Sequence, residues 1–176
     1  MGLMLAFDMG GPVNKVAYAF MLICVAQGVY TVVAIAAMAI CVPPLGLGLA
    51  TLIRRRNFSD EEREAGKAAL VMGCVGVTEG AIPFAAADPL RVIPSIMLGS
   101  ACGAVVAALS GAQCYAGWGG LIVLPVVEGK VGYLAAVAVG AVVTAVSVNL
   151  LKSLARKDQK PGDGKQDELE LDFEIH

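Results

Sequence analysis

The sequence has little charge, few aromatic residues and almost no histidine. Charged residues make up 16% of its 176 positions and aromatic residues 6%, and the one histidine is the terminal residue, His176. We therefore expect no histidine-based catalytic site in this chain. Lysine and arginine form no continuous basic stripe, which argues against a nucleic-acid partner.

Paired cysteines are also missing. The chain has five cysteines, but none stands in a CxxC pair or at the spacing of a metal site. All but Cys114 lie in apolar runs, where a thiol behaves as a small hydrophobic side chain. The sequence therefore predicts no metal, no cofactor and no catalytic residue among them. The five are Cys24, Cys41, Cys74, Cys102 and Cys114.

Hydrophobic and small residues, by contrast, are abundant. Hydrophobic residues make up 57% of the chain and the mean hydropathy is +0.74, above the level of a typical soluble domain. The 21 glycines belong to the small-residue composition that lets membrane helices approach closely. Charges gather over residues 54–67 and from Lys152 onward. The composition predicts an all-α, polytopic membrane protein.

The first half of the chain divides at polar and proline-rich points. Residues 1–7 are too short for a span or a signal peptide and read like the end of a helix whose beginning is missing. Residues 16–42, interrupted only by Gln27 and Gly28, exceed the roughly 20 residues that cross a bilayer. Pro43-Pro44 is predicted to bend or break the helix that continues to Ile53, where the arginines at 54–56 stop it.

A polar loop follows, and apolar stretches resume after it. Ser59 and Glu62 match a capping box, in which the Ser side chain accepts from a backbone amide and the Glu side chain reaches back. They predict a short surface helix over about residues 60–68. The later elements are expected to be a span over 92–110, a glycine-rich connection over 111–130, a last span over 131–151 and a disordered tail over 153–176.

The distribution of positive charge constrains how the chain crosses the membrane. The arginines at 54–56 and the cluster that begins at Lys152 should both face the cytoplasm. If residues 69–87 crossed the membrane, three spans would separate the two clusters and place them on opposite sides. If these residues form a re-entrant hairpin, two spans separate the clusters and both stay inside. Parity favours the hairpin; the alternative is an irregular crossing by residues 111–130.

The apolar stretch 69–87 contains one polar motif, Thr-Glu-Gly-Ala-Ile-Pro-Phe at 78–84. A carboxylate inside a membrane is costly and is usually functional. Glu79 offers two acceptor oxygens that match adjacent sugar hydroxyls, Thr78 adds a hydroxyl, and Gly80 permits a turn. We therefore predict solute contacts from these three residues. The alternative is a structural carboxylate, bonded to nearby amides or paired with Arg91.

A second polar motif, Asp-Met-Gly-Gly-Pro-Val-Asn-Lys, occupies residues 8–15. Asp8 and Asn14 flank its glycines, and broken membrane helices use such turns to bind solutes. We predict solute contacts from Asn14, Asp8, Gly11 and Lys15. The alternative is that Asp8 caps the following helix and pairs with Lys15.

Two further polar points have simpler interpretations. Asp88 is predicted to cap a helix in which Pro89 takes the first position, while Arg91 is a candidate to neutralise Glu79 or to meet a phosphate. Trp118 is predicted to be an interfacial anchor rather than a surface on which a sugar stacks.

Three segments closely resemble the fructose-specific membrane (IIC) component of the bacterial phosphoenolpyruvate-dependent sugar phosphotransferase system. They are Asp-Met-Gly-Gly-Pro-Val-Asn-Lys-Val-Ala-Tyr at 8–18, Val-Pro-Pro-Leu-Gly-Leu-Gly-Leu-Ala-Thr at 42–51 and Thr-Glu-Gly-Ala-Ile-Pro-Phe-Ala-Ala-Ala-Asp-Pro-Leu-Arg-Val-Ile-Pro-Ser at 78–95. The likeness covers about residues 1–152. It implies the C-terminal half of a phosphotransferase-system IIC fold over 1–152, with a tail over 153–176.

The resemblance also implies a function. Members of this family bind and translocate fructose or a related sugar, which a IIB partner, working with IIA, phosphorylates from a phosphocysteine. The resemblance implies a dimer in the bacterial inner membrane, re-entrant hairpins near the site and a cytoplasmic tail. Glu79 corresponds to a glutamate expected to bond sugar hydroxyls, and residues 10–15 are expected to line the same cavity. This chain has no phosphorylation site of its own, and the missing N-terminal half of IIC or a second copy of the chain is expected as a partner.

Other functions stay open at the level of sequence. The chain is alternatively a non-transporting remnant, or a regulatory subunit that pairs with a full-length permease. An ion-coupled carrier is a third hypothesis, against which the lack of further buried carboxylates argues. The motifs do not separate fructose from mannosylglycerate or other ketose-like substrates.

Overall fold

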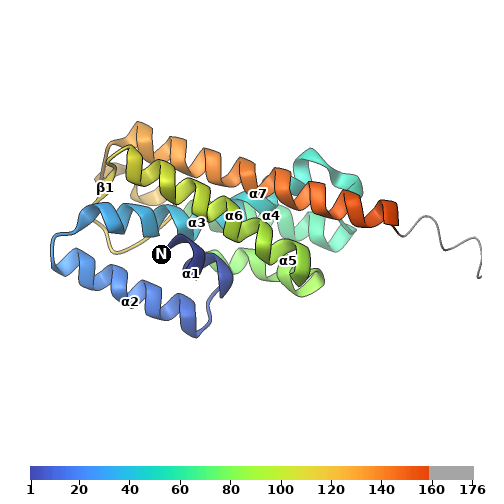
Figure 1. The fold of residues 1–176 in the computed structure, drawn as a ribbon, viewed down its shortest axis with the longest axis horizontal. Helices are drawn as coiled ribbons and strands as arrows, with labels where there is room; N and C mark the ends of the chain where they lie inside the picture. The colour runs from blue at the N-terminus through green and yellow to red at the C-terminus, as the bar shows by residue number, and fades with distance from the viewer. Residues whose placement is uncertain (159–176) are drawn as a thin grey trace, which may run out of the picture.

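The computed structural model describes residues 1–158, and they form a helical membrane protein (Figure 1). The all-α prediction is confirmed, because the two strands are only two residues long each. Three helices, α3, α6 and α7, are long and apolar enough to cross a membrane. The helices are α1 (Gly2–Phe7), α2 (Pro12–Ala26), α3 (Tyr30–Ile53), α4 (Asp60–Val75), α5 (Ile82–Ala87), α6 (Pro89–Leu109) and α7 (Lys130–Asp158). The shorter elements are η1 (Arg55–Asn57), η2 (Thr78–Ala81), η3 (Leu121–Val126), β1 (Gln113–Cys114) and β2 (Val127–Glu128).

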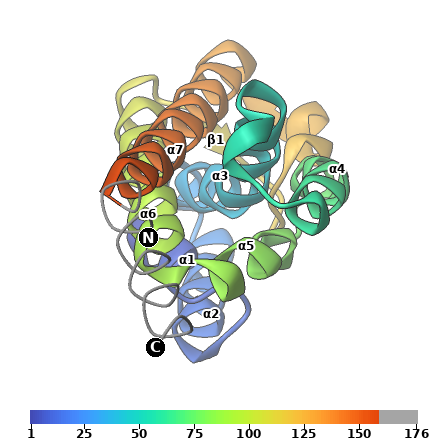
Figure 2. The ribbon, with the colours of Figure 1, turned by 90° about the vertical axis from the view of Figure 1, so that its right-hand side faces the viewer.

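Helix α3 lies at the centre of the bundle, with α4, α6 and α7 packed around it (Figure 2). Its most apolar stretch is 83% buried, whereas those of α6 and α7 are 39% and 44% buried. Glycines bring the backbones close: a Cβ atom on Gly140 would lie 2.7 Å from Val42 Cγ2, and one on Gly46 would lie 2.5 Å from Thr144 Cβ. This close approach of small residues is how membrane helices associate.

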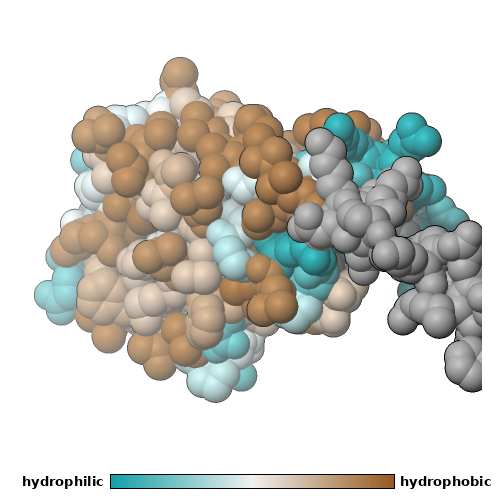
Figure 3. Space-filling view, turned by 45° about the vertical axis from the view of Figure 1, so that its right-hand side comes forward, coloured by the Kyte–Doolittle hydropathy of each residue, from teal (hydrophilic) through white to brown (hydrophobic). Residues whose placement is uncertain are grey.

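Apolar side chains cover much of the outer surface, as the flank in Figure 3 shows. Exposed residues on α6 and α7 include Leu98, Val105, Val142 and Leu150. Hydrophilic residues gather toward the end where α4, α5 and the end of α7 lie. This division matches a bundle whose flank faces lipid.

The apolar run over residues 16–42 is divided between two helices, so the prediction of one long span there is wrong. Helix α2 ends at Ala26, and Gly28 follows in a left-handed conformation with φ +74°. A residue with a Cβ atom seldom adopts that conformation, so Gly28 permits a reversal inside an apolar sequence. The central span is therefore α3, which starts at Tyr30.

The sequence predicted a bend or a break at Pro43 and Pro44; helix α3 continues through both prolines, so it does not break there. A proline removes a backbone donor and disfavours the helix before it. Both prolines are buried among neighbouring helices. Membrane helices tolerate proline in such surroundings, because packing against neighbours holds the helix together.

Helix α4 begins as predicted and ends later than predicted. The Glu62 amide donates to Ser59 Oγ (3.2 Å), and the Ser59 amide donates to Glu62 Oε2 (2.9 Å), which confirms the capping box. The helix then runs through Val75 to Gly76, a left-handed C-cap with φ +91°. The predicted helix stopped near residue 68, where the polar residues end and the apolar face begins.

The chain then turns back through η2 and α5, so that residues 60–88 form a hairpin (first hairpin). Both of its ends lie at the same end of the bundle, where Arg56, Asp88 and Lys152 line one pocket. Lys152 also forms an ion pair with Glu62 at 2.5 Å. The two basic clusters therefore lie at the same end, as the parity argument requires.

Residues 112–129 form a second hairpin that enters from the opposite end. The β1–β2 pairing closes its base, with Gln113 opposite Glu128. Tyr115 Oη donates to Glu128 Oε2 (2.8 Å), and this hydrogen bond to a carboxylate raises the pKa of Tyr115. Because both ends of this segment meet, it returns rather than crosses, and the alternative of an irregular crossing here is wrong.

The last helix is longer than the predicted span. Helix α7 extends to Asp158, so the first residues of the predicted tail, 153–158, are helical. The rest of that tail, 159–176, lies outside the described residues.

Candidate functional site

A cavity of about 670 Å³ lies between α2, η2 and the tip of the second hairpin. Both polar motifs of the sequence contribute to it, although they lie far apart along the chain. Its lining residues are Gly10, Asn14, Lys15, Tyr18, Ala19, Leu22, Ile40, Gly76, Val77, Thr78, Glu79 and Trp118. It is the candidate site.

The first motif forms a tight turn before α2. Gly10 has φ +82°, and a Cβ atom on Gly11 would collide with the Asp8 carboxylate. Asp8 Oδ2 accepts from the Val13 amide (2.7 Å) and so satisfies an otherwise unpaired amide at the start of α2. Asp8 and Gly11 are therefore outside the lining, and the alternative in which Asp8 caps the helix is the one observed.

Asn14 and Lys15 reach the cavity from the first turn of α2. Asn14 Nδ2 donates to the Leu5 carbonyl (3.1 Å), which fixes the amide group and leaves its oxygen without a partner in the described chain. Lys15 is exposed, and over residues 1–158 it makes no ion pair with Asp8. The predicted pairing of these two residues is not observed.

The second motif lies at the tip of the first hairpin. After Gly76 ends α4, the Val77 amide donates to the Met72 carbonyl (2.9 Å), and η2 carries Thr78 and Glu79 to the cavity. Thr78 is buried and Glu79 is exposed. Gly80 faces away from the cavity toward α4, because a Cβ atom there would lie 3.1 Å from Met72 Cβ.

The Glu79 carboxylate has no hydrogen bond or ion pair from any residue that the structure describes. Arg91, the predicted alternative partner, instead donates to Asp88 Oδ2 (2.8 Å). Gly10 of the first motif lies beside the Glu79 carboxylate, because a Cβ atom on Gly10 would lie 3.0 Å from Glu79 Oε1. The two motifs therefore touch each other, and the carboxylate is left available to a ligand.

Similar proteins carry the same kind of sequence. Over all of its residues, the chain is 85% identical to the fructose-like permease IIC component 2 of Escherichia coli (strain K12), of which it spans 49%. It is 50% identical over 155 residues, 86% of this chain and 27% of the relative, to a PTS system fructose-specific EIIB'BC component of Xanthomonas campestris. It is also 40% identical over 152 residues, 86% of this chain and 40% of the relative, to the PTS system fructose-specific EIIC component of Haloferax volcanii.

The chain belongs to the fructose-type IIC components. It spans about half the length, or less, of the relatives it matches. No family model matches it, and no solved structure does. The names of some relatives, EIIB'BC and EIIABC, show that IIC sequences also occur fused to IIB and IIA components.

Two aromatic residues of this IIC chain complete the cavity. Tyr18 Oη donates to the Gly117 carbonyl (2.7 Å), and Trp118 Nε1 donates to the Val75 carbonyl (2.8 Å). The two rings pack edge to face, with their centroids 6.3 Å apart. Trp118, predicted as an interfacial anchor, thus lines the cavity at the tip of the second hairpin.

Tyr18 was not predicted as a site residue, although the sequence contains a pattern that indicates it. Residues four apart lie on the same face of a helix. Asn14, Tyr18 and Leu22 follow that spacing, and all three line the cavity. A search along the helical face from Asn14 finds Tyr18.

Arg91 belongs to a different pocket, of about 540 Å³, at the basic end of this IIC chain. Asp88 stands at the N-cap of α6 with Pro89 after it, as predicted, but its side chain makes no capping bond and pairs with Arg91. Among residues 1–158, no group of acidic, cysteine or histidine side chains could hold a metal ion.

Proposed function

We propose that this chain supplies the sugar-binding cavity of a fructose-type IIC permease. The observation that supports this proposal is the meeting of the two polar motifs in one cavity, with Asn14 and Lys15 on α2 facing Thr78 and Glu79 on η2. The relatives are fructose-specific or fructose-like components by name. The ligand is fructose or a related sugar.

The chemistry of the lining suits a polyol. The Glu79 carboxylate accepts hydrogen bonds from two adjacent hydroxyl groups, and such charge-assisted bonds are about twice as strong as neutral ones. Thr78 Oγ1 and Asn14 Oδ1 add acceptors. Tyr18 and Trp118 supply apolar ring surface for the C–H face of a sugar ring. Asp8, Gly11 and Gly80 support the site by shaping the two turns.

The partners and the orientation belong to the same proposal. A IIB component, itself charged by IIA, phosphorylates the sugar, and the remaining IIC spans or a second copy complete the assembly. The chain lies in the bacterial inner membrane with its basic end and its C-terminal tail in the cytoplasm, since cytoplasmic loops carry the excess of lysine and arginine.

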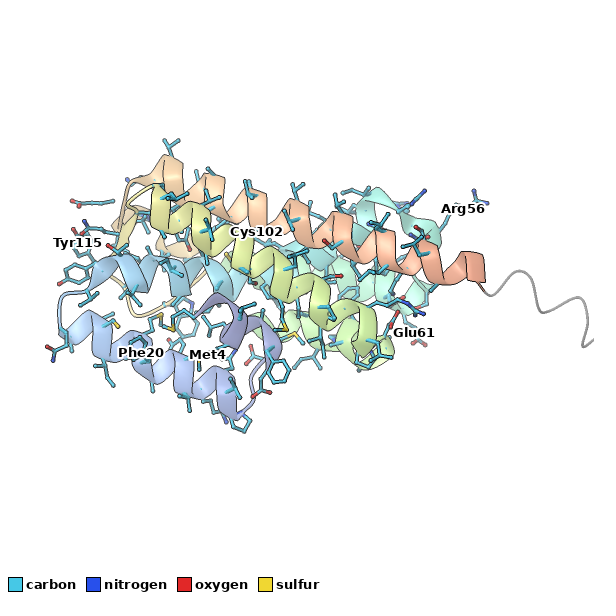
Figure 4. The ribbon with its side chains drawn as sticks, viewed as in Figure 1. Met4, Phe20, Arg56, Glu61, Cys102 and Tyr115 are labelled. Carbon is cyan, nitrogen blue, oxygen red and sulfur yellow. The ribbon has the colours of Figure 1, made fainter. Side chains whose placement is uncertain are left out.

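Fructose binding tests the proposal directly, because Trp118 is the one tryptophan of the chain and lines the cavity. Its fluorescence in lipid nanodiscs should change saturably with fructose. Glu79→Gln keeps the shape of the side chain and removes its charge, so the affinity should fall about tenfold, since hydrogen bonds to charged groups contribute about 1.5–3 kcal/mol. Glu61→Gln, on the exposed face of α4 at the basic end (Figure 4), should have no effect.

Sugar uptake provides the second measurement. Cells that supply a IIB component and the remaining IIC spans should take up fructose with the wild-type chain and with Glu61→Gln, and poorly with Glu79→Gln. Full uptake by Glu79→Gln would remove the proposed role of Glu79. A wild-type chain that neither binds nor transports sugar would favour a non-transporting subunit.

A further inference from the structure

The last part of the sequence has a pattern that the proposed function does not use. Residues 168–175 read Glu-Leu-Glu-Leu-Asp-Phe-Glu-Ile, so acidic and apolar residues alternate strictly. In an extended chain, successive side chains point to opposite sides. The alternation therefore places the carboxylates on one side and the apolar groups on the other. A segment surrounded by water needs no apolar side, so the pattern indicates a binding surface that has both characters.

The pocket at the basic end of the bundle has both characters. Its volume is about 540 Å³, and it shares no lining residue with the candidate sugar site. Its charged lining consists of three cations and two carboxylates, which leaves an excess of positive charge. They are Arg56, Arg91, Lys152, Glu62 and Asp88.

Two adjacent residues of this pocket can bind a further group. Arg91 is 42% exposed and, within the described chain, its guanidinium donates one hydrogen bond, to Asp88. A guanidinium has five N–H donors, so most of its donors are available. Leu90, which lines the same pocket, is 85% exposed. A cation with unused donors therefore lies beside an uncovered apolar side chain.

The chain leaves the described structure at the edge of the same pocket. Ala155 lines the pocket, and the last described residue of α7, Asp158, follows within one helical turn. The nine residues 159–167 can span at most about 30 Å when extended. They include Pro-Gly-Asp-Gly at 161–164, and such dipeptides are typical of turns. Residues 168–175 can therefore reach the pocket.

We propose that residues 168–175 bind this pocket within the same chain, with their acidic side chains on Arg91 and their apolar side chains on Leu90. Charge complementarity favours this segment, because residues 167–175 contain five acidic residues and no basic one. The covalent connection also favours it, because a short flexible linker gives a millimolar effective concentration. The bound segment contacts both ends of the first hairpin and the last span, and a cytoplasmic partner of the basic end competes with it.

The rate of maleimide labelling at position 90 measures this contact. The protein is the full chain with Leu90→Cys, without the five native cysteines, at one copy per nanodisc of neutral lipid. The comparison variant neutralises the acidic side of the segment by Glu168→Gln, Glu170→Gln, Asp172→Asn and Glu174→Gln. A contact with a dissociation constant of about 0.1 mM is about nine-tenths formed at a millimolar effective concentration, so the native segment should slow labelling about tenfold.

Salt and matched variants separate this contact from general effects. At about 1 M salt the Debye length is about 3 Å, so the native segment should no longer slow labelling. Arg91→Gln should accelerate labelling of Leu90→Cys, whereas Arg54→Gln, exposed and outside the pocket, should not. Asp163→Asn, outside the alternating segment, should keep labelling slow. Glu61→Cys, exposed at the same end (Figure 4), should label equally fast with either segment.

Three results would overturn the proposal. The first is equal labelling of position 90 with the native and the neutralised segment. The second is slow labelling that persists at high salt. The third is equal acceleration by Arg91→Gln and Arg54→Gln, which would reduce the contact to unspecific attraction. No sugar enters these measurements, so their failure leaves the proposed function untouched.

Discussion

Glu79 depends on a glycine in the other polar motif for its position. A Cβ atom on Gly10 would lie 3.0 Å from Glu79 Oε1 and 3.2 Å from its Cγ. These distances are tighter than ordinary van der Waals contact, so any side chain at position 10 displaces the carboxylate. The glycine thus couples the turn before α2 to the acceptor that the sugar is proposed to use.

We expect Gly10→Ala to weaken fructose binding about fivefold, because a displaced carboxylate loses about 1 kcal/mol of hydrogen-bond energy. The substitution also strains the backbone, since Gly10 has φ +82°. Gly28→Ala is the matched control, because Gly28 has φ +74° and nothing lies within 4 Å of the added Cβ atom. Trp118 fluorescence with fructose measures both, and an equal loss in the two variants would contradict the coupling.

The sequence predicted the polar lining better than the aromatic lining. Thr78 and Glu79 contrast sharply with apolar surroundings, and this contrast is visible without coordinates. Tyr18 and Trp118 show no such contrast, since aromatic residues are ordinary in membrane helices and their interfaces. Which way Asp8 and Gly80 face depends on the turns, and turn geometry in three dimensions is not contained in a residue pattern.

At the scale of elements, the tips of the two hairpins meet inside the bundle. Trp118 Nε1 donates to the Val75 carbonyl, and the Gly120 amide donates to Ala37 (3.2 Å), about two turns inside α3. Tyr133 Oη donates a hydrogen bond to the Gly120 carbonyl (2.8 Å). The contact closes one side of the cavity, so the two hairpins must be packed correctly for the site to exist.

The contact between the tips requires glycine at position 76. A Cβ atom there would collide with the Gly119 carbonyl and lie 3.0 Å from Trp118 Nε1. Gly76→Ala should therefore lower the free energy of unfolding by about 1–3 kcal/mol more than a strained alanine elsewhere, because an overpacked backbone contact must separate. Unfolding in mixed micelles of increasing SDS content measures this difference.

Gly111→Ala is the matched control for Gly76→Ala. Gly111 also has positive φ, +64°, but nothing lies within 4 Å of an added Cβ atom. Gly111→Ala therefore introduces the same kind of backbone strain as Gly76→Ala, but its Cβ atom collides with no neighbour. Equal destabilisation by the two substitutions would mean that the tips do not rely on close contact.

Element boundaries show which sequence signals survive in a membrane. The capping box at Ser59 was predicted correctly, because it depends only on local hydrogen bonds. Pro43 and Pro44 do not break α3, because the effect of a proline on a membrane helix depends on the neighbouring helices that surround it. Helix α2 ends at Ala26, next to Gln27 and Gly28, and this short interruption of the apolar run was not enough to predict that the chain reverses there.

At the scale of the whole molecule, the hairpins determine the topology. The first hairpin leaves and rejoins the basic end, so only α6 and α7 separate the arginines at 54–56 from Lys152. The ion pair of Lys152 with Glu62, both about nine-tenths buried, ties the last span to the base of that hairpin. Counting charges predicted this arrangement because parity does not depend on the details of packing. The depth to which each tip enters was not predictable in the same way.

This topology predicts which residues are reached from each side of the membrane. Arg56 and Glu61 lie at one end of the molecule and Tyr115 lies at the other (Figure 4). In a background without the five native cysteines, Glu61→Cys and Ser153→Cys should react with a membrane-impermeant maleimide only after the cytoplasmic side is opened. Lys130→Cys, at the opposite end of α7, should react in intact spheroplasts. The physical reason is that α7 crosses the membrane once, while the segment between residues 60 and 88 returns to its starting side. Labelling of residues 61 and 153 from opposite sides would show that the first hairpin crosses, and would overturn the parity argument together with the proposed position of Glu79.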